Sequence, residues 1–144
     1  MAFVKVMIHS VWGTKNRTPF LTTDVREKMI EHIKENAKSK QIFIDSINGY
    51  TEHLHCLFGL NADMTIAKTM QLIKGESAFW INKQKLLKTK FEWADEYFAV
   101  SVSESLLFKV RVYIKNQVEH HKKKTWAQEV EEFMRLYNFE QYHG

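Results

Sequence analysis

Apolar and polar residues follow two periods along the chain. Short runs rich in β-branched and aromatic residues predict four strands, at 3–12, 41–47, 53–58 and 97–102. Between them, apolar residues recur every three or four positions, as in Val25, Met29 and Ile33, and predict helices over 22–37 and 65–82. The expected order of elements is therefore βαββαβ.

Two more helices are expected after the fourth strand. Apolar residues at helical spacing predict one helix from about 103 to 121, and Thr125 with Gln128 forms a capping box that starts another. A βαββαβ order with short connections favours an α+β, ferredoxin-like sandwich with an antiparallel sheet, here with two additional C-terminal helices. Two helices would cover one sheet face, and we expect the other face to be open. The length fits a single domain over 1–144.

Composition narrows the class of protein. Hydrophobic residues make up 44% and charged residues 26%, with five Gly and one Pro, which is typical of a folded globular chain. The lone Cys56 cannot form an intrachain disulfide. No apolar run approaches the roughly 18 residues of a membrane span, and the N-terminus lacks a signal peptide, so we expect a cytoplasmic protein without a membrane partner. A net charge of +4 is compatible with a phosphate-rich partner.

Two histidines share one face of the third predicted strand. Because side chains alternate along a strand, His53 and His55 lie on one side while Leu54 and Cys56 lie on the other. Paired imidazoles at this spacing can bind one divalent ion. The alternative is a pair of solvated histidines on an exposed sheet face.

A tyrosine and a glutamine lie one helical turn apart in the helix at 103–121. Tyr113 and Gln117 therefore point from the same side, beside the apolar stripe. The alternative is a rim aromatic with an incidental polar neighbour. Further along, we expect His121 to face solvent, and the role of His120 stays open.

Both motifs, His53-Leu54-His55 and Tyr113 to Gln117, resemble the single-tyrosine HUH transposases of the insertion-sequence-200-like group, which includes the repeat-associated tyrosine transposases. Residues 9–15, 72–75 and 93–98 resemble the same family in order. One departure is Glu52, where family members usually have an aspartate.

The resemblance implies a metal-dependent endonuclease and strand transferase for DNA transposition and recombination. His53, His55 and Gln117 would hold one Mg²⁺ or Mn²⁺. Tyr113 would attack single-stranded DNA at hairpin-associated ends and form a 5′-phosphotyrosine. The family also implies a homodimer, in which the tyrosine could act in its own chain or in the partner.

Candidate DNA contacts are Lys15, Arg17, Lys74 and Gly75. Cations can neutralise phosphates, and a glycine lets a backbone approach closely, although helix packing is an equally physical reason for Gly75. The lysine-rich run 83–90 fits either DNA contact or a solvated face.

Three alternative functions remain. One is a non-catalytic module of the same fold that binds single-stranded nucleic acid on sheet aromatics. Another is a metal phosphoesterase that uses water as the nucleophile. The third is a domesticated HUH nuclease with the same tyrosine chemistry, which acts on chromosomal palindromes instead of mobilising its own element.

Overall fold

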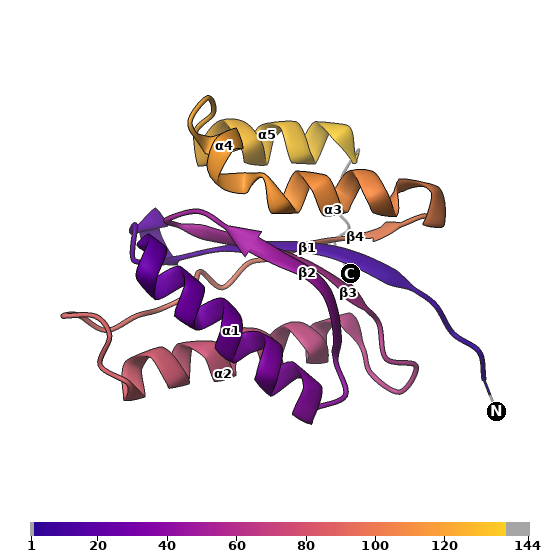
Figure 1. Ribbon diagram of the computed structural model, residues 1–144, viewed down its shortest axis with the longest axis horizontal. Helices are drawn as coiled ribbons and strands as arrows, with labels where there is room; N and C mark the ends of the chain where they lie inside the picture. Colours follow the sequence, from indigo (N-terminus) through magenta and orange to yellow (C-terminus); the bar gives the residue numbers. More distant parts are fainter. Residues whose placement is uncertain (1, 138–144) are drawn as a thin grey trace.

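A single antiparallel sheet organises the protein. We describe it from a computed structural model, which places residues 2–137. The spatial order of the strands is β2-β3-β1-β4, and every neighbouring pair is antiparallel (Figure 1). The strands are β1 (Met7–Gly13), β2 (Phe43–Gly49), β3 (His53–Gly59) and β4 (Phe98–Val102). This confirms the predicted α+β fold with a βαββαβ core.

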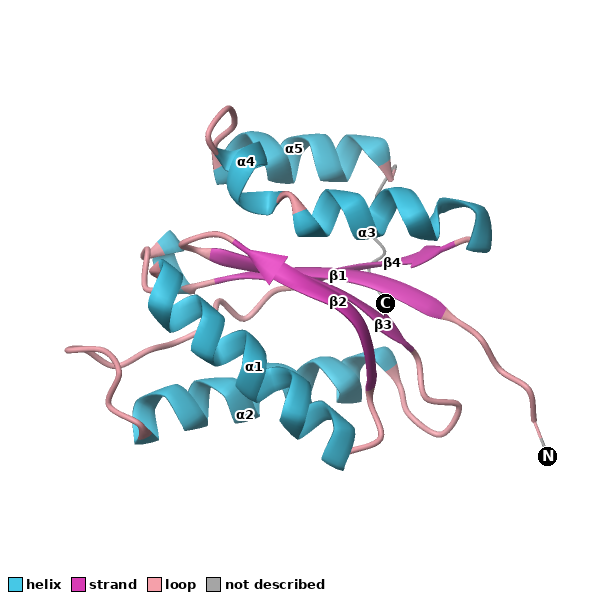
Figure 2. Cartoon of the chain, viewed as in Figure 1, coloured by secondary structure: helices cyan, strands magenta, loops and turns pink. Residues whose placement is uncertain are grey.

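Two helices cover one sheet face, α1 (Thr23–Ser39) and α2 (Ile66–Lys83) (Figure 2). The main core lies beneath them and receives Leu54, Cys56 and Phe58 from β3. Leu57 of β3 points to the opposite face of the sheet and belongs to a separate apolar cluster. The predicted alternation of β3 is therefore confirmed.

The second face is not open, as the sequence had suggested. Three helical segments cover it: α3 (Leu107–Lys115), α4 (Gln117–His121) and α5 (Trp126–Leu136) (Figure 1). Leu107, Val110 and Ile114 of α3 pack with Leu57 and Val102 of the sheet. The apolar stripe of α3 is removed from water by packing against this face of the sheet.

The C-terminal helices differ from the prediction in two respects, the first being that α3 begins at Leu107, after a short 3₁₀ turn, η2 (Glu104–Leu106). The expected helix over 103–121 is interrupted at Asn116, whose φ of −96° and ψ of 21° are not helical, so α3 and α4 are distinct. The last helix begins at the predicted capping box, with Thr125 and Gln128 bonded reciprocally.

The first strand is shorter than predicted at its start. Register pairs Met7 with both Gly59 and Val102, where the neighbouring strands end, so the pairing stops there after one further hydrogen bond from the N–H of Leu60 to the backbone oxygen of Val6. Phe3 is consequently exposed. None of the helices within residues 2–137 combines the length and hydrophobicity needed to span a bilayer. The ends of the predicted domain 1–144, residue 1 and residues 138–144, lie outside the described residues.

Candidate metal and tyrosine site

The central strand β3 carries both predicted histidines into the interface with the C-terminal helices. His53 and His55 have 0% exposure, and their ring centroids are 5.2 Å apart. The prediction that they share a face holds. Their expected exposure is wrong, because α4 and α5 fold back over this part of the sheet.

A carboxylate from α5 meets both imidazoles. Oε1 of Glu129 lies 2.8 Å from Nε2 of His55, and Oε2 lies 3.3 Å from Nε2 of His53. From α4, Oε1 of Gln117 lies 3.1 Å from the same His53 nitrogen. Glu129 and Gln117 are themselves buried. Four side chains from three elements therefore converge on one point.

Sequence reasoning missed Glu129, although a signal was present. It lies three positions after Trp126 and four before Phe133, within the apolar stripe of the last helix. An acid in such a stripe is buried when the helix docks, and a buried charge requires partners.

Outer hydrogen bonds orient the two imidazoles. Nδ1 of His53 donates to Oε1 of Glu52 at 2.9 Å, so the glutamate in place of the family's usual aspartate still reaches the ring. Nδ1 of His55 lies 2.9 Å from Nε2 of His9, a second residue that the sequence analysis did not single out. Such partners fix the tautomer and aim the other ring nitrogen at a metal.

The protonation states suit a cation site. Burial lowers the pKa of His55 to about 4, so this ring is neutral at neutral pH. Burial would raise the pKa of Glu129, but its contacts with His121, His53 and His55 outweigh that effect and lower it well below the usual range. For His53 the opposing effect of burial is also outweighed, since hydrogen bonds to Glu129 and Glu52 raise its pKa.

The donor atoms fit a divalent metal. Nε2 of His55 is buried and makes no hydrogen bond, although Oε1 of Glu129 is close by. Ligands at Mg²⁺ distances and right angles lie about 2.9 Å apart, near the 2.8 to 3.3 Å seen among these atoms. The ligand atoms of His53, His55 and Glu129 all lie within 4.8 Å of one another.

Tyr113, on α3, contacts the cluster of His53, His55 and Glu129. Its hydroxyl donates a hydrogen bond to Oε1 of Glu129, and its ring lies 5.3 Å from the ring of His55. Burial, followed by the negative charge of Glu129, raises the pKa of the phenol. Despite the break at Asn116, Gln117 still donates to the backbone oxygen of Tyr113 at 3.3 Å. Tyr113 and Gln117 therefore face the same site.

His121 does not face solvent, contrary to the prediction. Its side chain is 1% exposed, its Nδ1 donates to the backbone oxygen of Lys124 at 3.0 Å, and its Nε2 contacts Oε2 of Glu129. The docking of α5 against α4 buries it. His120 is more exposed and lies 4.0 Å from Oε1 of Glu129.

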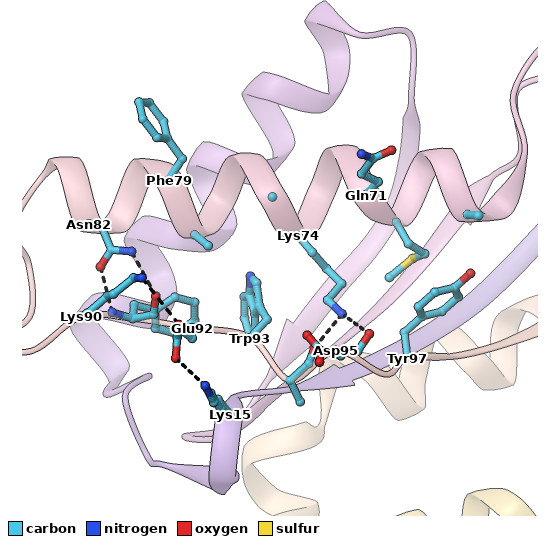
Figure 3. Close-up of a pocket in the computed structure, with 16 residues that line it drawn as sticks. Lys15, Gln71, Lys74, Phe79, Asn82, Lys90, Glu92, Trp93, Asp95 and Tyr97 are labelled. Carbon is cyan, nitrogen blue, oxygen red and sulfur yellow. Dashed lines mark hydrogen bonds and ion pairs between the residues drawn. The ribbon is translucent and has the colours of Figure 1, made fainter.

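Most of the predicted DNA contacts lie away from this cluster, in a groove between α2 and residues 90–97 (Figure 3). The groove encloses about 590 Å³ and is lined by Lys15, Lys74 and Gly75. Lys15 pairs with Glu92 at 3.0 Å, and Lys74 donates to the backbone oxygen of Ala94 at 2.7 Å.

Gly75 and Arg17 complete the predicted set. A Cβ added at Gly75 would meet no atom within 4 Å, so helix packing does not account for this glycine. Arg17 lines a smaller neighbouring cleft, which shares Ala94 with the groove. The lysine-rich run contributes Lys90 to the groove lining.

Comparison with known proteins agrees with this fold. A candidate transposase from Deinococcus radiodurans has a similar structure, with a TM-score of 0.65 and 23% identity, covering 81% of this chain and 93% of that one. A REP-associated tyrosine transposase bound to a REP hairpin gives a TM-score of 0.59 and 18% identity, covering 88% and 73%. No curated protein matches the sequence. The family model described as "Transposase IS200 like" matches residues 2–117, and the chain therefore belongs to the family of IS200-like transposases.

Proposed function

We propose that this transposase nicks and rejoins single-stranded DNA at hairpin-associated ends, with Tyr113 as nucleophile and a divalent metal as cofactor. The observation that carries the proposal is the convergence of the Tyr113 hydroxyl with His53, His55 and Glu129 at one buried point. A nucleophile beside a potential cation site is the arrangement that phosphoryl transfer requires.

The metal would be held by His53, His55, Glu129 and Gln117. This set extends the one that the family resemblance implies by one carboxylate. Two nitrogen and two oxygen donors suit Mn²⁺, and Mg²⁺ is the alternative. When bound, the ion supplies Lewis-acid polarisation of the scissile phosphate.

The protein's own residues would move the tyrosine proton. Because the pKa of Tyr113 is raised, its hydroxyl is protonated at neutral pH and needs an acceptor. Oε1 of Glu129 already accepts this hydrogen bond and is ionised. As the phenolic oxygen bonds to phosphorus, its proton would leave along the hydrogen bond to Glu129 and pass to solvent water, the P–O3′ bond would break, and the departing 3′ oxygen would take up a proton from water.

Rejoining would reverse the same steps. The 5′-phosphotyrosine conserves the phosphodiester bond energy, so the 3′-hydroxyl of another strand can attack phosphorus and release Tyr113. The attacking 3′-hydroxyl would give up its proton, the released tyrosine oxygen would take one up, and no nucleotide cofactor is needed. Cleavage and joining therefore use one set of residues.

The groove and cleft would bind the DNA. Lys15, Arg17, Lys74 and Gly75 line them, and a cationic groove suits a single strand or a hairpin stem. One structural relative is bound to a REP hairpin, which supports a hairpin as the substrate of this chain.

Tyr113 would act within its own chain. It contacts Glu129 and packs near His55 of the same molecule, so a partner's tyrosine is not required to complete the site. The family resemblance still suggests a homodimer, and we keep that as a proposal.

The test is incubation of the protein with a library of single-stranded hairpins and Mn²⁺, followed by denaturing gels and mass spectrometry. We expect a covalent adduct on the tryptic peptide 112–115, which contains Tyr113. Cleavage that leaves a free 5′-phosphate and no adduct would support a water-using phosphoesterase. Binding without cleavage would support the non-catalytic module.

A further inference from the structure

A second hollow lies beside the metal and tyrosine site. It encloses about 220 Å³ between the 3₁₀ turn Lys15–Arg17 and the start of α5, and its lining includes Thr14, Asn16, Arg17, Glu96 and Trp126. We call it the Arg17–Trp126 cleft. It contains a guanidinium group, an aromatic ring and a carboxylate.

Trp126 forms the wall between this cleft and the metal ligands. Its ring stacks on that of His53, with centroids 4.0 Å apart and planes 9° apart. The indole is only partly buried, so it borders both the cleft and the buried site. A Cβ at Gly13 would lie 3.4 Å from Nε1 of Trp126, so the end of β1 runs directly against the indole.

Arg17 lies on the other side of the cleft. Its side chain is exposed, and within residues 2–137 its guanidinium forms no ion pair or hydrogen bond. Asn16 and Arg17 both have left-handed backbone conformations, with φ of 58° and 55°, which cost energy in non-glycine residues. Backbone hydrogen bonds from Lys15 to Glu92 and from Arg17 to Thr14 hold the turn in place.

The cleft continues from the groove of Figure 3. Lys15 lines the groove and Arg17 lines the cleft, from the same short turn, and Ala94 lines both. A single strand that follows the groove would therefore reach the cleft next, where Trp126 separates it from the ring of His53.

We propose that the Arg17–Trp126 cleft binds the nucleotide of single-stranded DNA next to the scissile phosphate, with Arg17 on its phosphate and Trp126 stacked on its base. This inference rests on the proposed function, since it gives the substrate a path to Tyr113. The charges orient the nucleotide: Glu96 repels a phosphate on its wall and can accept a hydrogen bond from a base amino group.

Binding of a fluorescein-labelled single strand of about 12 nucleotides in EDTA tests the cleft without metal or cleavage. Trp126→Ala should weaken binding about 5- to 100-fold, while Trp126→Phe, which keeps a stacking ring, should stay near the unmodified protein. Arg17→Gln should reduce the slope of log affinity against log salt by about 0.7. Lys34→Gln, an exposed cation on α1, is the control and should change neither quantity.

Photo-crosslinking of the unmodified protein gives an independent readout if Trp126→Ala disturbs the docking of α5. A 5-iodouracil placed beside the cleavage position should crosslink to the tryptic peptide 125–135, which contains Trp126. Crosslinks confined to other peptides, or unchanged binding in both Arg17→Gln and Trp126→Ala, would overturn the cleft assignment.

The two proposals fail in different ways. If the cleft variants bind DNA normally while the protein still forms its Tyr113 adduct, only the cleft assignment is wrong. If the unmodified protein neither binds single strands nor forms an adduct, the proposed function is wrong as well.

Discussion

Oε1 of Glu129 lies 2.8 Å from Nε2 of His55, and no hydrogen bond joins the two atoms. Burial keeps the imidazole neutral while the carboxylate is ionised, so a nitrogen and an anionic oxygen lie within reach of one divalent ion. The carboxylate comes from α5, a helix outside the matched family region, 2–117.

Glu129→Gln should weaken Mn²⁺ binding by at least about tenfold, because it removes the anionic ligand. Isothermal titration with Mn²⁺ measures the effect. Glu131→Gln, the same change at an exposed position of α5, is the matched control and should bind as the unmodified protein does. Equal affinities for the two variants would exclude Glu129 from the site.

Metal should stabilise the folded protein through the same ligands. At a Mn²⁺ concentration of about 100 times Kd, the gain is about 2.7 kcal/mol, and EDTA should remove it. Thermal denaturation with and without Mn²⁺ measures the shift in Tm. His53→Ala should melt at the same temperature in both buffers, and a full shift in that variant would contradict the assignment.

Tyr113→Phe should abolish the covalent DNA adduct while leaving Mn²⁺ affinity within a few-fold, since the phenol contacts Glu129 without being one of the assigned ligands. Denaturing gels and Mn²⁺ titration give the two readouts. An adduct that persists in this variant would place the nucleophile elsewhere.

His9→Leu should lower metal affinity about tenfold, because the imidazole that orients His55 is lost. It should also reduce the free energy of unfolding by about 1 to 3 kcal/mol, since Nδ1 of His55 would be buried without a partner. Burial lowers the pKa of His9 to about 3, so this residue acts as a neutral partner. Urea unfolding and Mn²⁺ titration separate the two effects, and His9→Gln, which keeps hydrogen-bonding capacity, should restore part of each.

The ion pair between Asp45 and Arg111 should make the free energy of unfolding depend on pH in the acidic range. Arg111 of α3 donates to both carboxylate oxygens of Asp45 on β2, at 2.8 to 3.1 Å, and this lowers the pKa of Asp45. The stabilisation is therefore complete above the unfolded pKa of about 3.9 and is lost as pH falls through the lower, folded value. Asp45→Asn should unfold at a lower urea concentration at neutral pH, and the difference should shrink below about pH 4. A difference that is independent of pH would rule out this ion pair as its cause.

The sequence determined the relationships that depend on local periodicity. Alternation along a strand is sufficient to put His53 and His55 on one face, away from Leu54. Helical spacing brings Tyr113 and Gln117 to one side, and this relation holds even though the helix breaks at Asn116. Each of these relations is set within a few residues, by backbone geometry alone.

Only the tertiary structure decided what meets those residues. Glu129 and His121 are buried because α5 folds back over the sheet, and the spacing of residues within a helix does not say which surface that helix will cover. From the sequence, Lys74 is a candidate DNA contact with a free ammonium group. In the structure that group donates a hydrogen bond to the backbone oxygen of Ala94. Packing between distant segments therefore changed a two-histidine motif on an expected open face into a buried centre with its own carboxylate.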